Sequence, residues 1–147
     1  MTVVKRKRIM TEIKWDDSLS VGIKLIDEQH KMLIQRIKNL SDAVDSSRGL
    51  EQIMKTLDFM MDYTEFHFST EEKHMKEQGY RGFEAHQKQH EEFVSTLDQM
   101  VEDFDEDGAT EALSTSINTY LINWLIKHIK SVDRKFGEFL QEKGFER

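Results

Sequence analysis

Residues 53–75 read IMKTLDFMMDYTEFHFSTEEKHM, and the spacing of their inward-type side chains decides the fold. The positions that share one face are Ile53, Leu57, Met60, Thr64, His67, Glu71 and Met75. Steps of three and four residues match the helical repeat of about 3.6 residues, so one face of a helix points toward a common core. The stretch therefore predicts a long amphipathic helix packed in a bundle, ending near Gln78 and Gly79.

Three other stretches have the same period. Their inward positions are Ile23, Ile26, His30, Leu33, Ile37, Leu40 and Val44; then Phe83, His86, His90, Phe93, Leu97, Met100 and Phe104; then Leu113, Ile117, Tyr120 or Leu121, Trp124 and His128. The connections are short, and the third is an acidic loop ending in Gly108. Short connections make successive helices antiparallel, so we expect an all-α, up-down-up-down antiparallel four-helix bundle.

The remaining segments fit a single domain over residues 1–147. The segment with Trp15 and Val21 is expected to be an N-terminal loop laid against the bundle. After Asp133, the apolar residues of 136–140 indicate a short C-terminal helix. Residues 1–14 carry a basic cluster at positions 5–8 and are expected to form a flexible arm.

Composition excludes several classes of function. The chain has 147 residues, no proline and no cysteine, which favours long helices and excludes disulfides, iron–sulfur clusters and thiolate zinc sites. A formal net charge of -7 argues against a broad nucleic-acid surface. No apolar run approaches the roughly 20 residues that span a bilayer, so membrane insertion is not expected. The expected compartment is the reducing cytoplasm.

Five of the six histidines occupy seam positions where a bundle normally has leucine or isoleucine. They are His30, His67, His86, His90 and His128. Glu71 shares the seam of His67. A buried polar group without a partner costs roughly 1–3 kcal/mol, whereas a small domain has a net stability of only about 5–15 kcal/mol. Something must therefore satisfy these groups together, and a metal does this for imidazoles and carboxylates alike.

The spacing of these residues supports a metal site. His67 and Glu71 are four residues apart, as are His86 and His90, so each pair lies on one face of its helix. His128 and Asp133 are five apart and diverge by about 140° on a regular helix. If both bind metal, the helix should end, bulge or bend between residues 129 and 132.

Seven candidate ligands exceed the four of a structural zinc site and suit two octahedral ions that share bridging groups. Carboxylates bridge metals well and imidazoles do not, so Glu71 and Asp133 are the candidate bridges. A dinuclear site of nitrogen and carboxylate oxygen fits iron best, followed by manganese. Histidine-rich coordination supplies little negative charge and should favour the diferrous state.

These residues resemble the hemerythrins, in particular the bacterial members. The resemblance is carried by Trp15, Ser20-Val21-Gly22-Ile23, Ile26-Asp27-Glu28-Gln29-His30, Tyr63, His67-Phe68, Glu71-Glu72, Met75, Gly79-Tyr80, His86, His90, Trp124-Leu125, His128-Ile129 and Asp133. One departure is Arg81, where relatives often have proline; it affects a turn and leaves the site intact.

The resemblance implies a role for each candidate ligand. His86, His90 and His128 would complete one saturated iron, while His30 and His67 would serve a second iron with an open position. Glu71 and Asp133, with a solvent-derived oxo or hydroxo group, would bridge the two ions.

Other residues near the ligands have candidate roles. A dry pocket for oxygen could be formed by Leu33, Phe68, Trp124, Leu125 and Ile129, which could equally be ordinary core residues. Asp27 and Tyr63 are candidates to hold the outer nitrogens of ligating histidines, with surface or capping roles as the alternative. His74 is expected at the surface or rim.

The expected function is reversible binding of molecular oxygen, without enzymatic turnover, for carriage, storage or delivery. An oxygen-consuming enzyme is a possible recipient. One alternative is a di-iron oxidase, peroxidase or nitric-oxide-handling enzyme. Another is an oxygen-sensing module, for which a fused signalling domain is missing from this sequence.

Overall fold

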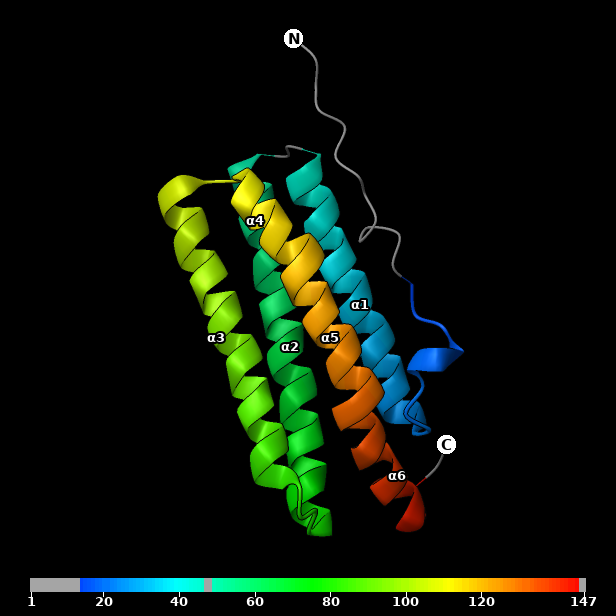
Figure 1. Cartoon of the computed structure of the whole chain (residues 1–147). Helices are drawn as coiled ribbons and strands as arrows, with labels where there is room; N and C mark the ends of the chain where they lie inside the picture. Colours follow the sequence, from blue (N-terminus) through cyan, green and yellow to red (C-terminus); the bar gives the residue numbers. More distant parts are fainter. Residues whose placement is uncertain (1–13, 47–48, 146–147) are drawn as a thin grey trace.

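The computed structural model describes residues 14–46 and 49–145, and they form an antiparallel bundle of four long helices (Figure 1). The helix α1 spans Lys24–Asp45, α2 spans Leu50–Gln78 and α3 spans Phe83–Asp107. The fourth helix runs from Glu111 to Glu142 in several consecutive pieces. The expected all-α, up-down-up-down architecture is confirmed. The basic cluster of the N-terminal arm lies outside the described residues.

The fourth helix is continuous but contains two π-helical segments. Its pieces are α4 (Glu111–Thr115), the π segment η3 (Ser116–Leu121), α5 (Ile122–His128), the π segment η4 (Ile129–Asp133) and α6 (Arg134–Glu142). The backbone stays in the right-handed helical region at every junction. The predicted short C-terminal helix after Asp133 is α6, which continues directly from η4, and Figure 1 shows it as the lower end of the fourth helix.

Each π segment holds one more residue per turn than the rest of the helix and so shifts the residues that face the core. In η3 this decides between the two candidates at the seam, because Leu121 is fully buried while Tyr120 is half exposed. The loop before this helix is also shorter than expected. The acidic residues up to Asp107 still belong to α3, and Gly108 ends that helix with a positive φ of 76°.

The core divides into an apolar half and a polar half along the bundle axis. Around the α1–α2 and α3–α4 connections the interior is filled by buried aliphatic and aromatic side chains such as Leu40, Phe104 and Leu113. The other half buries His30, Glu71 and the other polar seam residues instead. No helix among residues 14–46 and 49–145 combines the length and apolar character needed to cross a membrane.

The N-terminal loop packs against the bundle, as expected, and the structure places it on the polar half. Its short 3-10 turn η2 (Asp17–Leu19) buries Leu19, and Val21 is buried next to α6. The carboxylate of Asp27 in α1 accepts hydrogen bonds from the Val21 amide at 2.8 Å and from the Ser20 hydroxyl. The loop is thus fastened to the helix that also carries His30.

Candidate metal centre

All four long helices contribute to one cluster of donors in the polar half of the bundle. His30 comes from α1, His67 and Glu71 from α2, and His86 and His90 from α3. His128 ends α5, and Asp133 ends the π segment η4. All seven side chains are buried, with residue exposures of 0–2%. The helical spacing predicted this convergence, and the structure brings the seven residues together.

The π segment η4 is what allows Asp133 to face the centre. His128 and Asp133 are five residues apart, and a π turn aligns residues at this spacing, whereas an α turn does not. The His128 Nε2 atom lies 3.2 Å from Asp133 Oδ1. The predicted bulge between residues 129 and 132 is confirmed. The hydroxyl of Ser131 donates to the Lys127 carbonyl at 2.6 Å within this turn.

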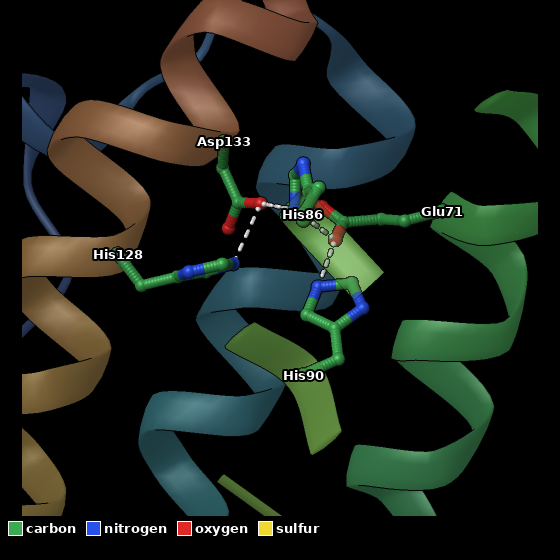
Figure 2. A group of neighbouring side chains, drawn as sticks. All are labelled: Glu71, His86, His90, His128 and Asp133. Atoms are coloured by element: carbon green, nitrogen blue, oxygen red, sulfur yellow. Dashed lines mark ion pairs between the residues drawn. The ribbon is translucent and has the colours of Figure 1, made fainter. Parts of the chain in front are cut away.

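The two carboxylate oxygens of Glu71 face different histidines, and Figure 2 shows the side that faces His86 and His90. The atom Oε1 lies 3.1 Å from His90 Nε2 and 3.5 Å from His86 Nε2. The atom Oε2 lies 3.5 Å from His67 Nε2 and 3.8 Å from His30 Nε2. Glu71 therefore stands between two groups of imidazoles and presents one oxygen to each.

Asp133 divides its oxygens in the same way. Its Oδ1 lies 2.9 Å from His86 Nε2 and 3.2 Å from His128 Nε2, whereas its Oδ2 lies 3.0 Å from His30 Nε2. The cluster thus has a three-histidine side, formed by His86, His90 and His128, and a two-histidine side, formed by His30 and His67. Both carboxylates span the two sides.

The donor atoms that face the centre of the cluster point at common positions between the side chains and not directly at one another. Seven of these atoms have no hydrogen-bond partner in the described chain, namely Nε2 of His30, His86, His90 and His128, both oxygens of Glu71, and Oδ1 of Asp133. Several approach one another to 2.9–3.5 Å without the directions of a hydrogen bond. Such groups cost roughly 1–3 kcal/mol each when left unsatisfied. A cation at each shared position satisfies them.

The donor set offers two such positions. One ligand atom each from Glu71, His86, His90, His128 and Asp133 lies within 4.8 Å of all the others, and so do atoms from His30, His67, Glu71 and Asp133. The groups contain five and four residues and share the two carboxylates, which gives seven donors in all. Imidazole nitrogen with carboxylate oxygen suits divalent first-row metals. The residues present therefore fit a pair of metal ions.

Burial and charge determine the protonation of the metal-free cluster. Burial lowers the pKa of His67 to about 4, because the nearby Glu71 offsets only part of the desolvation. Burial also acts on His30, but the carboxylates of Asp133 and Glu71 outweigh it and raise the pKa of His30 to about 9. Burial disfavours ionised Glu71 and Asp133 too, yet the surrounding imidazoles hold both pKa values well below the usual range. The carboxylates are thus ionised and suited to a cation.

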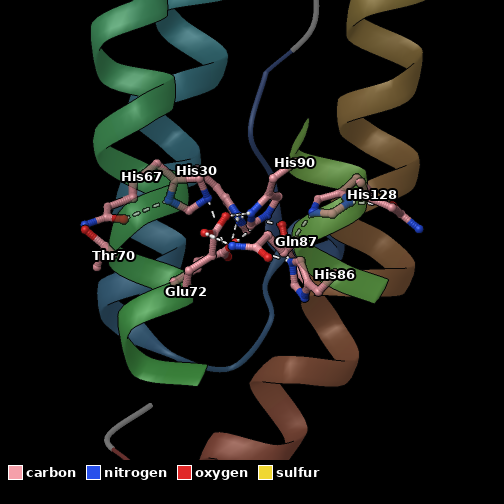
Figure 3. A network of polar contacts seen from close by, with 12 residues as sticks. His30, His67, Thr70, Glu72, His86, Gln87, His90 and His128 are labelled. Atoms are coloured by element: carbon pink, nitrogen blue, oxygen red, sulfur yellow. Dashed lines mark hydrogen bonds and ion pairs between the residues drawn. The ribbon is translucent and has the colours of Figure 1, made fainter. Parts of the chain in front are cut away.

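The outer nitrogens of three ligand candidates are held by residues to which the sequence analysis gave no such role, and Figure 3 labels one of them, Glu72, near His90. His67 Nδ1 donates to Gln29 Oε1 at 2.7 Å, His90 Nδ1 to Glu72 Oε2 at 2.8 Å, and His128 Nδ1 to Gln89 Oε1 at 2.8 Å. Donation from Nδ1 leaves the Nε2 lone pair facing the centre, which is the form that binds metal.

Neither of the two candidates for this role, Asp27 and Tyr63, holds an outer nitrogen among the described contacts. Asp27 faces the N-terminal loop instead, and Tyr63 packs beside Phe66. Tyr63 makes no hydrogen bond to His67 among the described contacts. A sequence signal was available, since Gln29, Glu72 and Gln89 are each the immediate chain neighbour of a donor. Each of them serves a histidine on a different helix, however, so only the packing reveals the pairing.

The five apolar pocket candidates lie in or beside the core. The Phe68 ring stacks on His90 with centroids 3.8 Å apart, and Trp124 stacks on His128 at 4.6 Å. Leu33, Leu125 and Ile129 are buried, whereas Trp124 is only partly buried. His74 stands apart from the cluster, near Glu77 and the Phe145 ring, as expected for a rim position.

The fold and the donors define an antiparallel helical bundle whose core gathers metal-binding residue types. Residues 21–140 match the family model of the hemerythrin HHE cation binding domain, and this chain belongs to the hemerythrin family. It is 33% identical to a bacteriohemerythrin of Stenotrophomonas maltophilia over 129 residues, covering 88% of this chain and 82% of the relative.

A myohemerythrin and a solved hemerythrin structure agree with this assignment. A myohemerythrin of Theromyzon tessulatum is 33% identical over 123 residues, which cover 84% of this chain and 89% of the relative. A crystal structure of wild-type hemerythrin superposes with a TM-score of 0.76 at 26% identity, covering 86% of this chain and 96% of that one. The similarity therefore extends over nearly the whole bundle.

Proposed function

We propose that this chain binds molecular oxygen reversibly at a non-haem di-iron centre, as a carrier, store or delivery protein. The observation that carries the proposal is the orientation of Glu71 and Asp133, each of which turns one oxygen to the three-histidine side and the other to the two-histidine side. A carboxylate oriented in this way is suited to bridge two ions a short distance apart. Membership of the hemerythrin family supports the same assignment.

Iron is the proposed metal because the donors are five imidazoles and only two carboxylates. Such a set is intermediate in softness and adds little negative charge, so it favours the ferrous state of both ions. A bound pair of ferrous ions supplies the chemistry, since together they can give two electrons to dioxygen and take them back on release. The carboxylates and imidazoles of this chain hold the ions in place.

The unequal sides of the cluster support a ligand-binding role on one side only. The three-histidine side offers five residues and the two-histidine side offers four. If both ions prefer the same number of ligands, the position served by His30 and His67 has one more place for an outside ligand. We therefore assign oxygen binding to the two-histidine side.

The buried surroundings support reversible binding over turnover. Water and protons promote loss of reduced oxygen species, so a carrier needs a dry pocket. Leu33 and Ile129 are fully buried, and Phe68 covers one face of His90. We propose that these side chains, with Trp124 and Leu125, keep water from the centre. We infer a non-enzymatic protein on this basis.

The test is to load the protein with iron, reduce it without air, admit oxygen, record the visible spectrum and then remove the oxygen. A visible absorption band should appear with oxygen and disappear on its removal. The His67→Ala variant should lose the band because it removes a donor of the two-histidine side. The matched His74→Ala variant should keep it, since His74 lies at the rim.

Two outcomes would contradict the proposal. If no band forms when oxygen is admitted to the reduced, iron-loaded protein, the proposal that the centre binds oxygen is wrong. Rapid irreversible oxidation, with repeated consumption of a supplied reductant, would indicate an oxidase or peroxidase instead of a carrier.

A further inference from the structure

The outer partners of the ligand histidines differ in charge. His67 and His128 donate to the neutral amide oxygens of Gln29 and Gln89. His90 donates to the carboxylate of Glu72, with 2.8 Å between His90 Nδ1 and Glu72 Oε2. Among the described residues, Glu72 is the one carboxylate in contact with an outer nitrogen of the five clustered histidines. The three-histidine side therefore carries a negative charge that the two-histidine side lacks.

Glu72 is held in place by a second contact. Gln87 lies one turn before His90 in α3, and its side-chain amide donates to Glu72 Oε1 at 3.1 Å. The other oxygen of Glu72, Oε2, accepts from His90 (Figure 3). The Phe68 ring stacks flat on a face of the His90 ring, with the ring centroids 3.8 Å apart. The ring is thus fixed by stacking and by a charged hydrogen bond at once, with Nε2 facing the centre, 3.1 Å from Glu71 Oε1.

Glu72 is also in contact with solvent, whereas His90 is almost fully buried. Both line a pocket of about 330 Å³ between α2 and α3, together with Gln87 and Glu91. The side chain of Glu72 is 21% exposed, whereas that of His90 is 2% exposed. A partly solvated carboxylate keeps its charge and transmits it to the buried imidazole through the hydrogen bond.

We infer that Glu72 is a positioning residue that makes the two metal positions unequal. It orients His90 and increases the electron donation of this imidazole, because a carboxylate partner makes a ligating histidine more basic. The three-histidine side therefore binds metal more tightly and holds a higher positive charge more readily than the two-histidine side. This inference rests on the proposed di-iron function, whose oxygen-binding part it does not need.

Two substitutions of Glu72 separate the effect of its charge from the effect of its hydrogen bond to His90. Glu72→Gln keeps an oxygen that can accept from His90 but removes the charge, whereas Glu72→Ala removes both. Substitutions of this kind typically lower metal affinity by about 10–100-fold. We expect zinc affinity at one of the two positions to fall about tenfold in Glu72→Gln and by up to about 100-fold in Glu72→Ala, measured by competition with a chromophoric chelator.

A series of double variants that moves the negative charge from one histidine to another shows which metal position Glu72 affects. Adding Gln89→Glu to Glu72→Gln returns the charge to the same side through His128 and should restore most of the affinity. Adding Gln29→Glu instead places the charge beside His67 and should strengthen the other position. The matched control Glu91→Gln removes a charge from the same pocket, where Glu91 makes no described contact with a ligand histidine, and should change neither position.

Two further measurements report the charge itself. In zinc-loaded protein, the ¹⁵N resonances of His90 should shift in Glu72→Gln, while those of His67 stay in place. In iron-loaded protein, the midpoint potential of one ion should rise in Glu72→Gln and return in the double variant with Gln89→Glu. A merely structural role of Glu72 would leave the potential of a fully loaded variant unchanged.

The inference is overturned if Glu72→Gln matches the unsubstituted protein in zinc affinity, His90 resonance and potential, or if Glu91→Gln has the same effect. Failure of the oxygen test is a separate result. If no reversible band forms while the zinc affinities and potentials follow the charge series, the oxygen-binding proposal fails and the role of Glu72 stands.

Discussion

His30 and His67 show how much the environment of a single residue matters in this protein. Both imidazoles are fully buried, and their ring centroids lie 4.7 Å apart. Even so, the pKa of His30 rises to about 9 and that of His67 falls to about 4. Burial lowers the pKa of both imidazoles, but at His30 the carboxylates of Asp133, 3.0 Å away, and Glu71 outweigh it. At His67 the nearest carboxylate oxygen is 3.5 Å away and offsets only part of the effect of burial. Carboxylate placement therefore sets the properties of each donor.

The shared position of Glu71 leads to a prediction at the residue scale. Glu71→Ala removes an oxygen from both sides of the cluster, so both metal positions should weaken together. His67→Ala removes a donor from one side only and should leave the three-histidine position intact. The measurement is the metal content per chain after loading and gel filtration, with the circular dichroism spectrum as a check on folding.

Equal metal loss in the two variants would contradict the assignment of Glu71 as a shared ligand. The same result would also follow if the two positions filled only together. Zinc titration of His67→Ala separates the cases, since independent filling gives one tight equivalent.

At the scale of elements, the fourth helix depends on its π segments. The segment η4 adds one residue to a turn, which brings Asp133 onto the face of His128. The next helix, α6, continues from that point and places Gly137 against the N-terminal loop. A change of one residue in η4 therefore affects the centre and the loop contact together.

Changing the length of η4 tests this dependence. One alanine inserted between Ser131 and Val132 rotates Asp133 by about 100° relative to His128, so metal binding should be lost. Deletion of Ser131 instead converts the π turn into an α turn and keeps both residues on one face. Metal content and thermal unfolding check the pair of variants. Normal loading of the insertion variant would show that η4 does not set the position of Asp133.

Gly137 is the second point at which an element depends on one residue. A Cβ added there would lie 2.1 Å from the Val21 carbonyl oxygen. Helix propensity alone predicts that Gly137→Ala stabilises α6 by up to about 1 kcal/mol. Overpacking costs about 1–3 kcal/mol, so we expect net destabilisation and a loosened N-terminal loop, measured by urea unfolding and limited proteolysis.

Gly49→Ala is the comparison, because no atom of the described residues lies within 4 Å of the added Cβ and the φ of Gly49 is already -56°. Its only expected cost is a weaker N-cap of α2, below about 1 kcal/mol. A Gly137→Ala variant more stable than the original protein would show that the loop can move away without loss.

At the scale of the whole molecule, the bundle combines an apolar half that needs no metal with a polar half that does. The apolar half buries side chains such as Leu40, Phe104 and Leu113, which pack in any metal state. The polar half buries seven inward atoms without hydrogen-bond partners among the described residues. Metal binding and folding are therefore coupled mainly through one end of the molecule.

Removal of metal should lower stability without unfolding the chain. A ligand present at roughly 1,000 times its Kd adds about 4 kcal/mol, which corresponds to roughly 10 °C in Tm for a chain of this size. We expect the chelated protein to keep most of its helical circular dichroism and to melt about 10 °C lower. Complete loss of helix on chelation would mean that the apolar half cannot fold by itself.

Periodicity along the chain was enough to predict the four helices, their antiparallel order and the burial of His30, His67, His86, His90 and His128. A helical repeat is local, so spacing alone determines which residues share a face. The same logic predicted an irregularity between His128 and Asp133, because residues five apart do not align on an α-helix.

Only the tertiary structure decided how the atoms of different helices meet. It assigned one oxygen of Glu71 and of Asp133 to each side of the cluster. It paired His67 with Gln29 instead of the candidate Tyr63, and His90 with Glu72. It also joined the C-terminal helix to the fourth helix through η4. These contacts depend on the rotation and offset of one helix against another, which packing fixes and which no spacing within a single helix records.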